Sequence, residues 1–187
     1  MSYNYLEQLL QTEHGHVMEI GAGKGVNTNV LCDLPMVDRV IVIDPFESCW
    51  DDDDVDTSYT EPYPYDRWLE NITLYQFDRV HLIQKRSDDK TIFDELKDMG
   101  PIIFCFVDGL QKEENIINDL TLLDKLKVKY ICLDDWERET ELSQVKRGTM
   151  RFMETNDNYE ILETRKMTES GLERIGNNRV VSFLKRK

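Results

Sequence analysis

The stretch Glu19-Ile20-Gly21-Ala22-Gly23-Lys24-Gly25 decides the fold of this chain. It begins at the end of a short apolar segment, residues 16–20, that is typical of a β-strand. It precedes a segment with helical apolar spacing, residues 27–34. Three glycines at alternate positions allow the backbone to turn tightly and to approach a ligand closely, beside the free N–H groups of a helix start. The sequence therefore predicts a ligand-binding turn between a strand and a helix.

The rest of the chain alternates between strand and helix patterns. Apolar runs typical of strands fall at residues 39–43, 80–84, 102–107 and 130–133. Helical apolar spacing falls at residues 3–12, 65–77, 91–99, 113–126 and 137–154. This alternation predicts βαβ units with right-handed crossovers, and hence a mostly parallel sheet. Two consecutive strand patterns, 159–164 and 179–185, close the chain and predict an antiparallel edge.

The composition limits the class of protein. The 187 residues carry 23 basic and 37 acidic side chains, a net charge of -14, and 40% of them are hydrophobic, so residues 1–187 are expected to form a single domain with one core. The acidic balance disfavours nucleic acid or an anionic membrane as partner, because both bind clustered Lys and Arg. No apolar stretch approaches the roughly 18–20 residues of a membrane span, and residues 1–11 lack a signal-peptide pattern. We therefore expect a cytoplasmic protein with reduced cysteines, namely Cys32, Cys49, Cys105 and Cys132.

Three kinds of glycine-rich turn compete for residues 19–25. A phosphate-binding P-loop would need a glycine at Met18 and a hydroxyl at Gly25, and the dinucleotide fingerprint GxGxxG would need a glycine at Val26. The third kind fits, because an acidic residue followed by GxGxG resembles motif I of the class I S-adenosylmethionine-dependent methyltransferases. Asp44, at the end of the second strand, matches the acidic residue with which that family binds the ribose hydroxyls; an Asp in this position also commonly forms a turn.

This resemblance implies a Rossmann-like α/β fold, with a mostly parallel seven-stranded sheet, an antiparallel C-terminal hairpin and helices on both faces. It also implies S-adenosylmethionine as the cofactor. The cofactor-binding residues implied in this way are Glu19, Gly21, Ala22, Gly23, Gly25, Asp44, Pro45, Ser87, Asp88 and Asp108. Ser87 and Asp88 are expected beside the adenine, although an ordinary polar turn is an equally natural interpretation of these two residues.

Carboxylates follow the fourth and the fifth strand, as Asp108-Gly109 and Asp134-Asp135-Trp136. Because parallel strands end at one edge of a sheet, these three carboxylates are expected to converge there and to repel one another. A divalent cation would relieve the repulsion, and oxygen ligands favour Mg2+, with Mn2+ or Ca2+ as alternatives. The competing interpretation is that Asp134-Asp135 caps the helix predicted from residue 137.

A narrower resemblance concerns the small metal-dependent O-methyltransferases that act on sugars and on glycosylated natural products. The segments that carry it are Ile43-Asp44-Pro45-Phe46, Val107-Asp108-Gly109 and Leu133-Asp134-Asp135-Trp136, with Glu114 and Asp119-Leu120 in the next helix. The resemblance implies that Asp108, Asp134 and Asp135 hold the metal. The metal would bind two vicinal hydroxyls of the acceptor and lower the pKa of one of them.

The sequence departs from that group at the general base. Members usually have Asp or His after the DG turn, whereas this chain has Leu110-Gln111, and the Gln111 amide cannot take up a proton at neutral pH. The candidate catalytic residues are Asp108, Asp135 and Gln111. The proton would pass to a substitute base, namely Asp135 itself, Lys112 or His81, or it would be lost to water with assistance from the metal.

The predicted function is methyl transfer from S-adenosylmethionine to a hydroxyl of a small-molecule or saccharide acceptor. Aromatic residues that stack on sugar rings are expected around the site, namely Trp50, Tyr59, Tyr63, Tyr65 and Trp136, while Trp68 is expected in the core. Residues 47–61, with the acidic run 51–54, are expected to form an exposed loop. The alternatives are a catechol-like phenol as acceptor, a cofactor-binding protein that has lost its activity, and an NAD-dependent enzyme.

Overall fold

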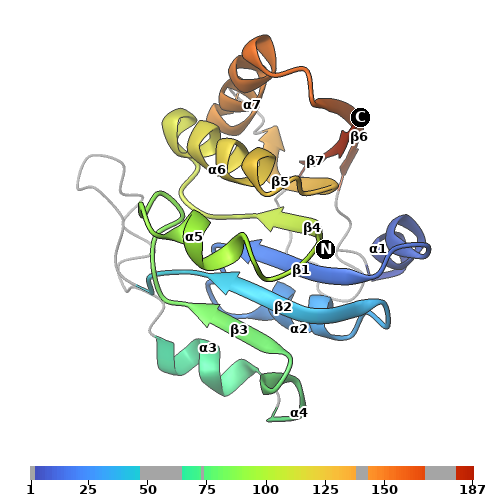
Figure 1. Ribbon diagram of the computed structural model, residues 1–187, viewed down its shortest axis with the longest axis vertical. Helices are drawn as coiled ribbons and strands as arrows, with labels where there is room; N and C mark the ends of the chain where they lie inside the picture. The colour runs from blue at the N-terminus through green and yellow to red at the C-terminus, as the bar shows by residue number, and fades with distance from the viewer. Residues whose placement is uncertain (1–2, 47–64, 73, 138–142, 167–179) are drawn as a thin grey trace.

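A seven-stranded sheet in the order β3-β2-β1-β4-β5-β7-β6 runs through the molecule (Figure 1). The computed structural model describes residues 3–46, 65–72, 74–137, 143–166 and 180–187. The strands are β1 (Gly15–Ile20), β2 (Val37–Ile43), β3 (Val80–Ile83), β4 (Ile102–Val107), β5 (Tyr130–Glu137), β6 (Tyr159–Lys166) and β7 (Val180–Arg186). Strands β1 to β5 pair in parallel, and β7 pairs antiparallel with both β5 and β6. This arrangement confirms the predicted fold class, a mostly parallel sheet with an antiparallel C-terminal hairpin.

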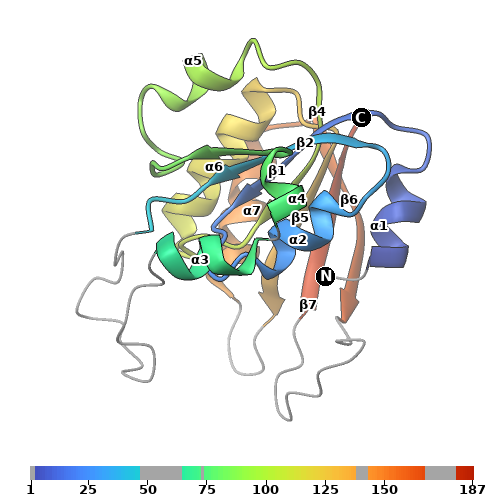
Figure 2. The same ribbon diagram turned by 90° about the horizontal axis from the view of Figure 1, so that it is seen from below.

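Helices cover both faces of the sheet. They are α1 (Tyr3–Leu10), α2 (Val26–Cys32), α3 (Tyr65–Asn71), α4 (Leu74–Phe77), α5 (Ile92–Leu96), α6 (Glu113–Lys125) and α7 (Gln144–Thr155). One apolar cluster joins α5, α6 and α7 to the sheet, and a second joins α1, α2 and α3 to the opposite face. Figure 2 shows α5 and α3 on opposite sides of β1 and β2. Both faces of the central strands are therefore buried, which explains why these strands are nearly continuous apolar runs.

The register of the parallel strands brings their carboxyl ends level. Ile20 pairs with Ile43 of β2 and with Val107 of β4, and Val107 in turn pairs with Leu133 of β5. The residues that come next in the chain are Gly21, Asp44, Asp108 and Asp134. The edge at which the sequence predicts a ligand site is therefore assembled by strand pairing.

Two predicted helices differ in the structure. The helix expected at 65–77 consists of two shorter helices, α3 and α4, and the helix expected from residue 137 begins only at Gln144. Ser143 is its N-cap: the hydroxyl oxygen accepts a hydrogen bond from the Lys146 N–H at 3.1 Å, and the hydroxyl donates to the Trp136 carbonyl at 2.6 Å. The interpretation of Asp134-Asp135 as a helix cap is therefore wrong.

The fifth strand is longer than the apolar run that predicted it. β5 continues to Glu137, which pairs with Val180 of β7 after an irregularity in the register that begins past Leu133. Pairing with β7 on both sides of this irregularity, at Leu133 and at Glu137, carries the strand past its apolar run. Asp134 and Asp135 consequently lie within β5 rather than after it.

Cys32, Cys105 and Cys132 are buried free thiols, as expected, while Cys49 lies outside the described residues. The longest helix among the described segments, α6, has 13 residues, and none of these helices has the length and apolar character of a membrane span.

Candidate functional site

The glycine turn after β1 packs directly on the turn after β4. Gly21 has a φ of 83°, in the left-handed region that favours glycine. A β-carbon on residue 21 would lie 2.5 Å from the Asp108 carbonyl oxygen and 2.6 Å from the Gly109 Cα. Gly21 is thus required by backbone conformation and by the close approach of two turns.

The other end of the glycine turn rests on α3. Gly25, with a φ of 78°, is the N-cap residue of α2, and a β-carbon there would lie 3.0 Å from the side chains of Trp68 and Ile72. Asn71 adds polar contacts, because its side chain donates to the Lys24 carbonyl at 2.9 Å and its own carbonyl accepts from the Asn29 side chain at 2.8 Å. The turn is therefore held between β4 and α3.

The Asp44 carboxylate binds the backbone of the glycine turn. Its Oδ2 atom accepts hydrogen bonds from the N–H groups of Ala22, at 2.7 Å, and Gly23, at 3.1 Å. Its Oδ1 atom accepts the N–H of Phe46 at 2.7 Å, so Asp44 also forms the local turn that was the alternative interpretation. The structure thereby brings together the predicted cofactor residues of the first and second strands. Pro45 lies within the same turn, between Asp44 and Phe46.

Glu19 supports the glycine turn from inside the protein. Its side chain is fully buried, and its Oε2 atom accepts a hydrogen bond from the Thr28 hydroxyl of α2. The Thr28 oxygen in turn accepts a hydrogen bond from the Trp68 indole N–H at 3.4 Å. Burial raises the pKa of Glu19 to about 8, the Thr28 hydrogen bond acts in the opposite direction, and the charge of Asp44 adds to the rise. Glu19 is a predicted cofactor residue, but the structure gives it an inner, supporting position; Thr28 was not identified from the sequence.

Ser87 and Asp88 lie in the connection between β3 and α5. Asp88 is exposed and pairs with Arg86, with an Nε–Oδ1 distance of 3.0 Å. Ser87 is half-buried, and its side chain lowers the pKa of the Asp119 carboxyl on α6, which burial raises to about 7. The two residues predicted to contact the adenine therefore differ in their surroundings: Asp88 is exposed to solvent, and Ser87 is half-buried.

The carboxylates at the ends of β4 and β5 do not form a metal site in the described part of the chain. Asp134 is 4% exposed, and Asp135, half-buried, has a φ of 48°. The Gln111 amide Nε2 donates a hydrogen bond to Asp135 Oδ2 at 2.9 Å. Within the described ranges there is no group of three or more His, Cys, Asp or Glu side chains that could hold a metal ion. The residues in this arrangement do not fit the predicted Mg2+.

His81 lies within β3 opposite Ile41, two residues before the carboxyl edge, and Lys112 is the N-cap residue of α6. Trp136 is 3% exposed and Trp68 is fully buried, so Trp68 is confirmed as core and Trp136 offers little surface for stacking. Tyr65 is half-buried and stacks on Trp68, with ring centroids 5.9 Å apart. Trp50, Tyr59, Tyr63 and the predicted loop 47–61 lie outside the described residues.

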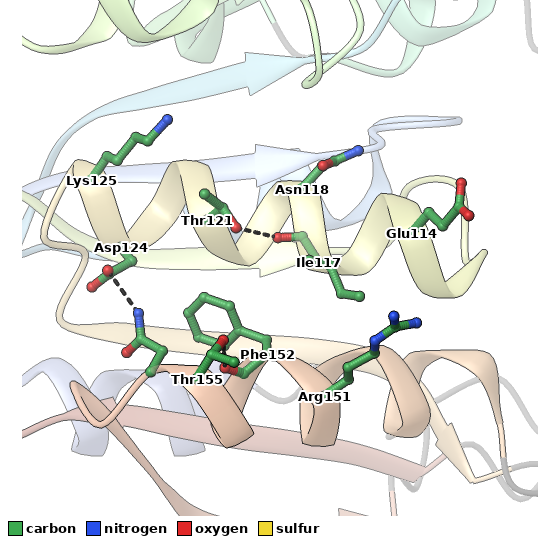
Figure 3. Close-up of a pocket in the computed structure, with 10 residues that line it drawn as sticks. Glu114, Ile117, Asn118, Thr121, Asp124, Lys125, Arg151, Phe152 and Thr155 are labelled. Atoms are coloured by element: carbon green, nitrogen blue, oxygen red, sulfur yellow. Dashed lines mark hydrogen bonds between the residues drawn. The ribbon is translucent and has the colours of Figure 1, made fainter.

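A groove of about 630 Å³ lies between α6 and α7 (Figure 3). The residues that line it are Glu114, Ile117, Asn118, Thr121, Asp124, Lys125, Arg151, Phe152, Thr155 and Asn156. The Asn156 side chain donates to Asp124 Oδ2 at 2.8 Å, and the Thr121 hydroxyl donates to the Ile117 carbonyl at 2.7 Å. None of the residues predicted to bind cofactor, acceptor or metal lines this groove, so it is separate from the candidate site.

Comparison of the sequence with protein-family models and with curated proteins gives no significant match. Among solved structures, the O-methyltransferase TomG from Streptomyces achromogenes, which takes part in tomaymycin synthesis and was solved with S-adenosylmethionine, is 19% identical. The alignment covers 99% of this chain and 78% of TomG, with a TM-score of 0.61. A protein from Clostridium thermocellum proposed to be an rRNA methylase is 14% identical over 100% of this chain and 97% of that one, with a TM-score of 0.62.

A third similar structure is CalS11, a TDP-rhamnose 3'-O-methyltransferase of calicheamicin biosynthesis. It is 14% identical, and the alignment covers 98% of this chain and 77% of CalS11 with a TM-score of 0.59. The three proteins share their fold with this chain along most of their lengths. The chain therefore has the fold of the class I S-adenosylmethionine-dependent methyltransferases.

Proposed function

We propose that this chain transfers the methyl group of S-adenosylmethionine to a hydroxyl oxygen, and that the acceptor is a sugar or a glycoside. The observation that carries the proposal is the contact of Asp44 with the glycine turn. The Asp44 carboxylate fixes the glycine turn through the Ala22 and Gly23 N–H groups, and its Oδ1 atom, which accepts one N–H, keeps a lone pair for a hydroxyl donor such as a ribose. Both groups lie at the carboxyl edge of the sheet, where open α/β folds bind nucleotides.

The proposed reaction is a displacement at the methyl carbon. The acceptor oxygen forms a bond to this carbon while the carbon–sulfur bond breaks, and the sulfonium leaves as the neutral thioether S-adenosylhomocysteine. The hydroxyl proton passes to a base. Because the sulfonium is already activated, most of the rate gain comes from holding the two reactants in line.

Asp135 is the residue to which we assign the proton. Gln111 donates its amide N–H to Asp135 Oδ2, which fixes the orientation of this carboxylate, and a base held by a second side chain is a common catalytic arrangement. The left-handed backbone of Asp135 is a further sign of a constrained site. Asp108 lies against Gly21 and would position the methyl donor. Gln111 thus has a positioning role in place of the missing Asp or His.

A saccharide acceptor is favoured by the sequence resemblance, and CalS11 acts on a sugar. The net charge of -14 disfavours a nucleic-acid substrate, although one similar structure is assigned to rRNA. A catechol-like phenol is the second acceptor class. Mg2+ assistance remains a prediction from the sequence, which the arrangement of Asp108, Asp134 and Asp135 does not support.

Two measurements test the proposal. Isothermal titration with S-adenosylmethionine and S-adenosylhomocysteine should show binding of both, and NAD should not bind. Methyl transfer from labelled cofactor should then be assayed against nucleotide sugars, glycosides and catechols, each with Mg2+ and with EDTA. Failure to bind either cofactor form would overturn the proposal. Binding without transfer to any hydroxyl acceptor would favour the inactive cofactor-binding protein, and loss of transfer in EDTA would restore the metal.

A further inference from the structure

Glu113 joins the first turn of α6 to the first turns of α7. Its Oε1 atom lies 3.1 Å from Nη1 of Arg151, and its Oε2 atom lies 3.5 Å from Nε of Arg147. Its backbone N–H donates a hydrogen bond to the side-chain oxygen of Gln144 at 3.2 Å. Figure 3 shows the Arg151 side chain extending from α7 toward α6. Side chains of one helix therefore hold the other helix at the residue where it begins.

A glycine allows the two helices to approach closely at this point. Gly148 is buried in α7, and a β-carbon there would lie 2.7 Å from the Glu113 carbonyl oxygen and 3.0 Å from Cβ of Ile116. Any larger residue at position 148 would therefore displace the start of α6 from α7. Glycine in the interior of a helix lowers its stability relative to alanine. The sequence of α7 thus favours the close approach at Glu113 over the stability of the helix.

Both sides of this contact lead to the carboxylate proposed as the base. Gln111, whose amide donates to Asp135 Oδ2 at 2.9 Å, precedes Glu113 by two residues. On the other side, Ser143 is the N-cap residue of α7, and its hydroxyl donates to the Trp136 carbonyl at 2.6 Å. Trp136 directly follows Asp135 in β5. The contacts therefore form a closed circuit from Asp135 through the starts of α6 and α7 and back to the backbone of β5.

We propose that Glu113 is a positioning residue for Asp135, because it fixes the turn that carries Gln111 relative to β5. The inference rests on the proposed function, in which Asp135 takes the hydroxyl proton of the acceptor. Partly exposed ion pairs add little to the stability of a fold, so the contribution of Glu113 is to position rather than to stability. Position matters here because a displacement of about 1 Å at a reacting group can lower a rate by a large factor.

The first test observes the Gln111 side chain in the free protein, without cofactor or acceptor. A side-chain amide proton that is donated to a carboxylate resonates downfield, and loss of a signal in Gln111→Leu assigns it in the proton–nitrogen correlation spectrum. In Glu113→Ala and in Gly148→Ala, this signal should move toward the position of an amide that is bonded to water. Glu154→Ala, the same truncation at an exposed position of α7, should leave it in place.

The second test is a double-mutant cycle in single-turnover methyl transfer at saturating cofactor. Glu113→Ala should lower the rate constant of transfer by about 3–5-fold, while the dissociation constant of S-adenosylmethionine changes by less than about twofold. In the Gln111→Leu background, Glu113→Ala should have no further effect, because Gln111 is the residue through which Glu113 acts. A loss of folded protein would lower the rate equally in both backgrounds. Glu154→Ala should transfer at the wild-type rate in either background.

The outcomes separate this inference from the proposed function. If the wild type transfers no methyl group to any acceptor, the proposed function fails, and the role of Glu113 in catalysis fails with it. If the wild type is active, the inference is overturned by either of two results: a Gln111 amide signal that stays in place in Glu113→Ala, or an equal loss of rate with and without Gln111. The proposed function stands in both cases. Glu113 is half-buried, so Glu113→Ala carries the test should the clash in Gly148→Ala prevent folding.

Discussion

Gly21 lies so close to Asp108 that a β-carbon on residue 21 would be 2.5 Å from the Asp108 carbonyl oxygen. This contact joins the turn after β1 to the turn after β4, two segments that are almost 90 residues apart in the chain. Both turns belong to the proposed cofactor site, so the shape of the site depends on the absence of one side chain.

Gly21→Ala is therefore expected to destabilise the fold by about 1–3 kcal/mol and to abolish detectable binding of S-adenosylhomocysteine, because the substitution adds backbone strain and a clash. Thermal unfolding and calorimetry measure the two effects. Gly100→Ala is the matched control: Gly100 has a φ of 101°, but its nearest neighbour to a β-carbon is 3.6 Å away, at His16. This control should lose stability and keep its affinity for the ligand; equal ligand binding by both variants would contradict the prediction.

Asp44→Asn is expected to weaken the binding of S-adenosylhomocysteine by about tenfold or more. The three backbone N–H groups at Asp44 need acceptors, and an amide nitrogen in place of one carboxylate oxygen would oppose an N–H with another donor. Asp38→Asn, at an exposed position of β2, removes the same charge and should leave the affinity unchanged. A similar loss in both variants would show that net charge, rather than the turn, governs binding.

Gln111→Leu is expected to lower kcat by about tenfold while the dissociation constant of S-adenosylmethionine changes little. The substitution removes the hydrogen bond to Asp135 Oδ2 and leaves the glycine turn intact. Single-turnover methyl transfer at saturating cofactor measures the effect. In the Asp135→Asn background the same substitution should have almost no further effect; additive losses in the double variant would separate Gln111 from Asp135.

Glu19→Gln is expected to change how stability depends on pH. Because the pKa of Glu19 is raised from 4.5 to about 8 in the folded state, the folded protein binds the proton more tightly than the unfolded chain. The free energy of unfolding of the wild type should therefore fall as the pH rises from about 4.5 to about 8. Above that range, the Glu19 carboxyl should cause no further loss of stability.

In the Glu19→Gln variant this fall should be absent, so the variant should gain stability relative to the wild type as the pH rises. Chemical denaturation at pH 5, 7 and 9 measures the difference. Glu160→Gln, at an exposed position of β6, is the control and should keep the wild-type profile. A Glu19→Gln curve parallel to that of the wild type would show that Glu19 stays ionised in the folded protein.

The sequence alone predicted the sheet, and it predicted that the candidate site residues follow the carboxyl ends of the parallel strands. The apolar run 102–107 and the segment 16–20 correspond to β4 and β1, because a strand that is buried on both faces must be apolar along its whole length. The glycines at 21, 23 and 25 and the acid at 44 were assigned to one site because they resemble motif I of the class I S-adenosylmethionine-dependent methyltransferases and the acidic residue that follows the second strand in that family. These features depend on local chain geometry, which the order of residues specifies directly.

Only the tertiary structure determined how the acidic residues are used. β5 continues past Asp134 and Asp135 to Glu137, which pairs with Val180 of β7, more than 40 residues later in the chain. Gln111 meets Asp135, 24 residues later in the chain, through a hydrogen bond that no sequence spacing predicts. The environment of a carboxylate, whether solvent, an amide donor or an apolar core, is set by what packs against it from distant segments, and its chemistry follows from that environment.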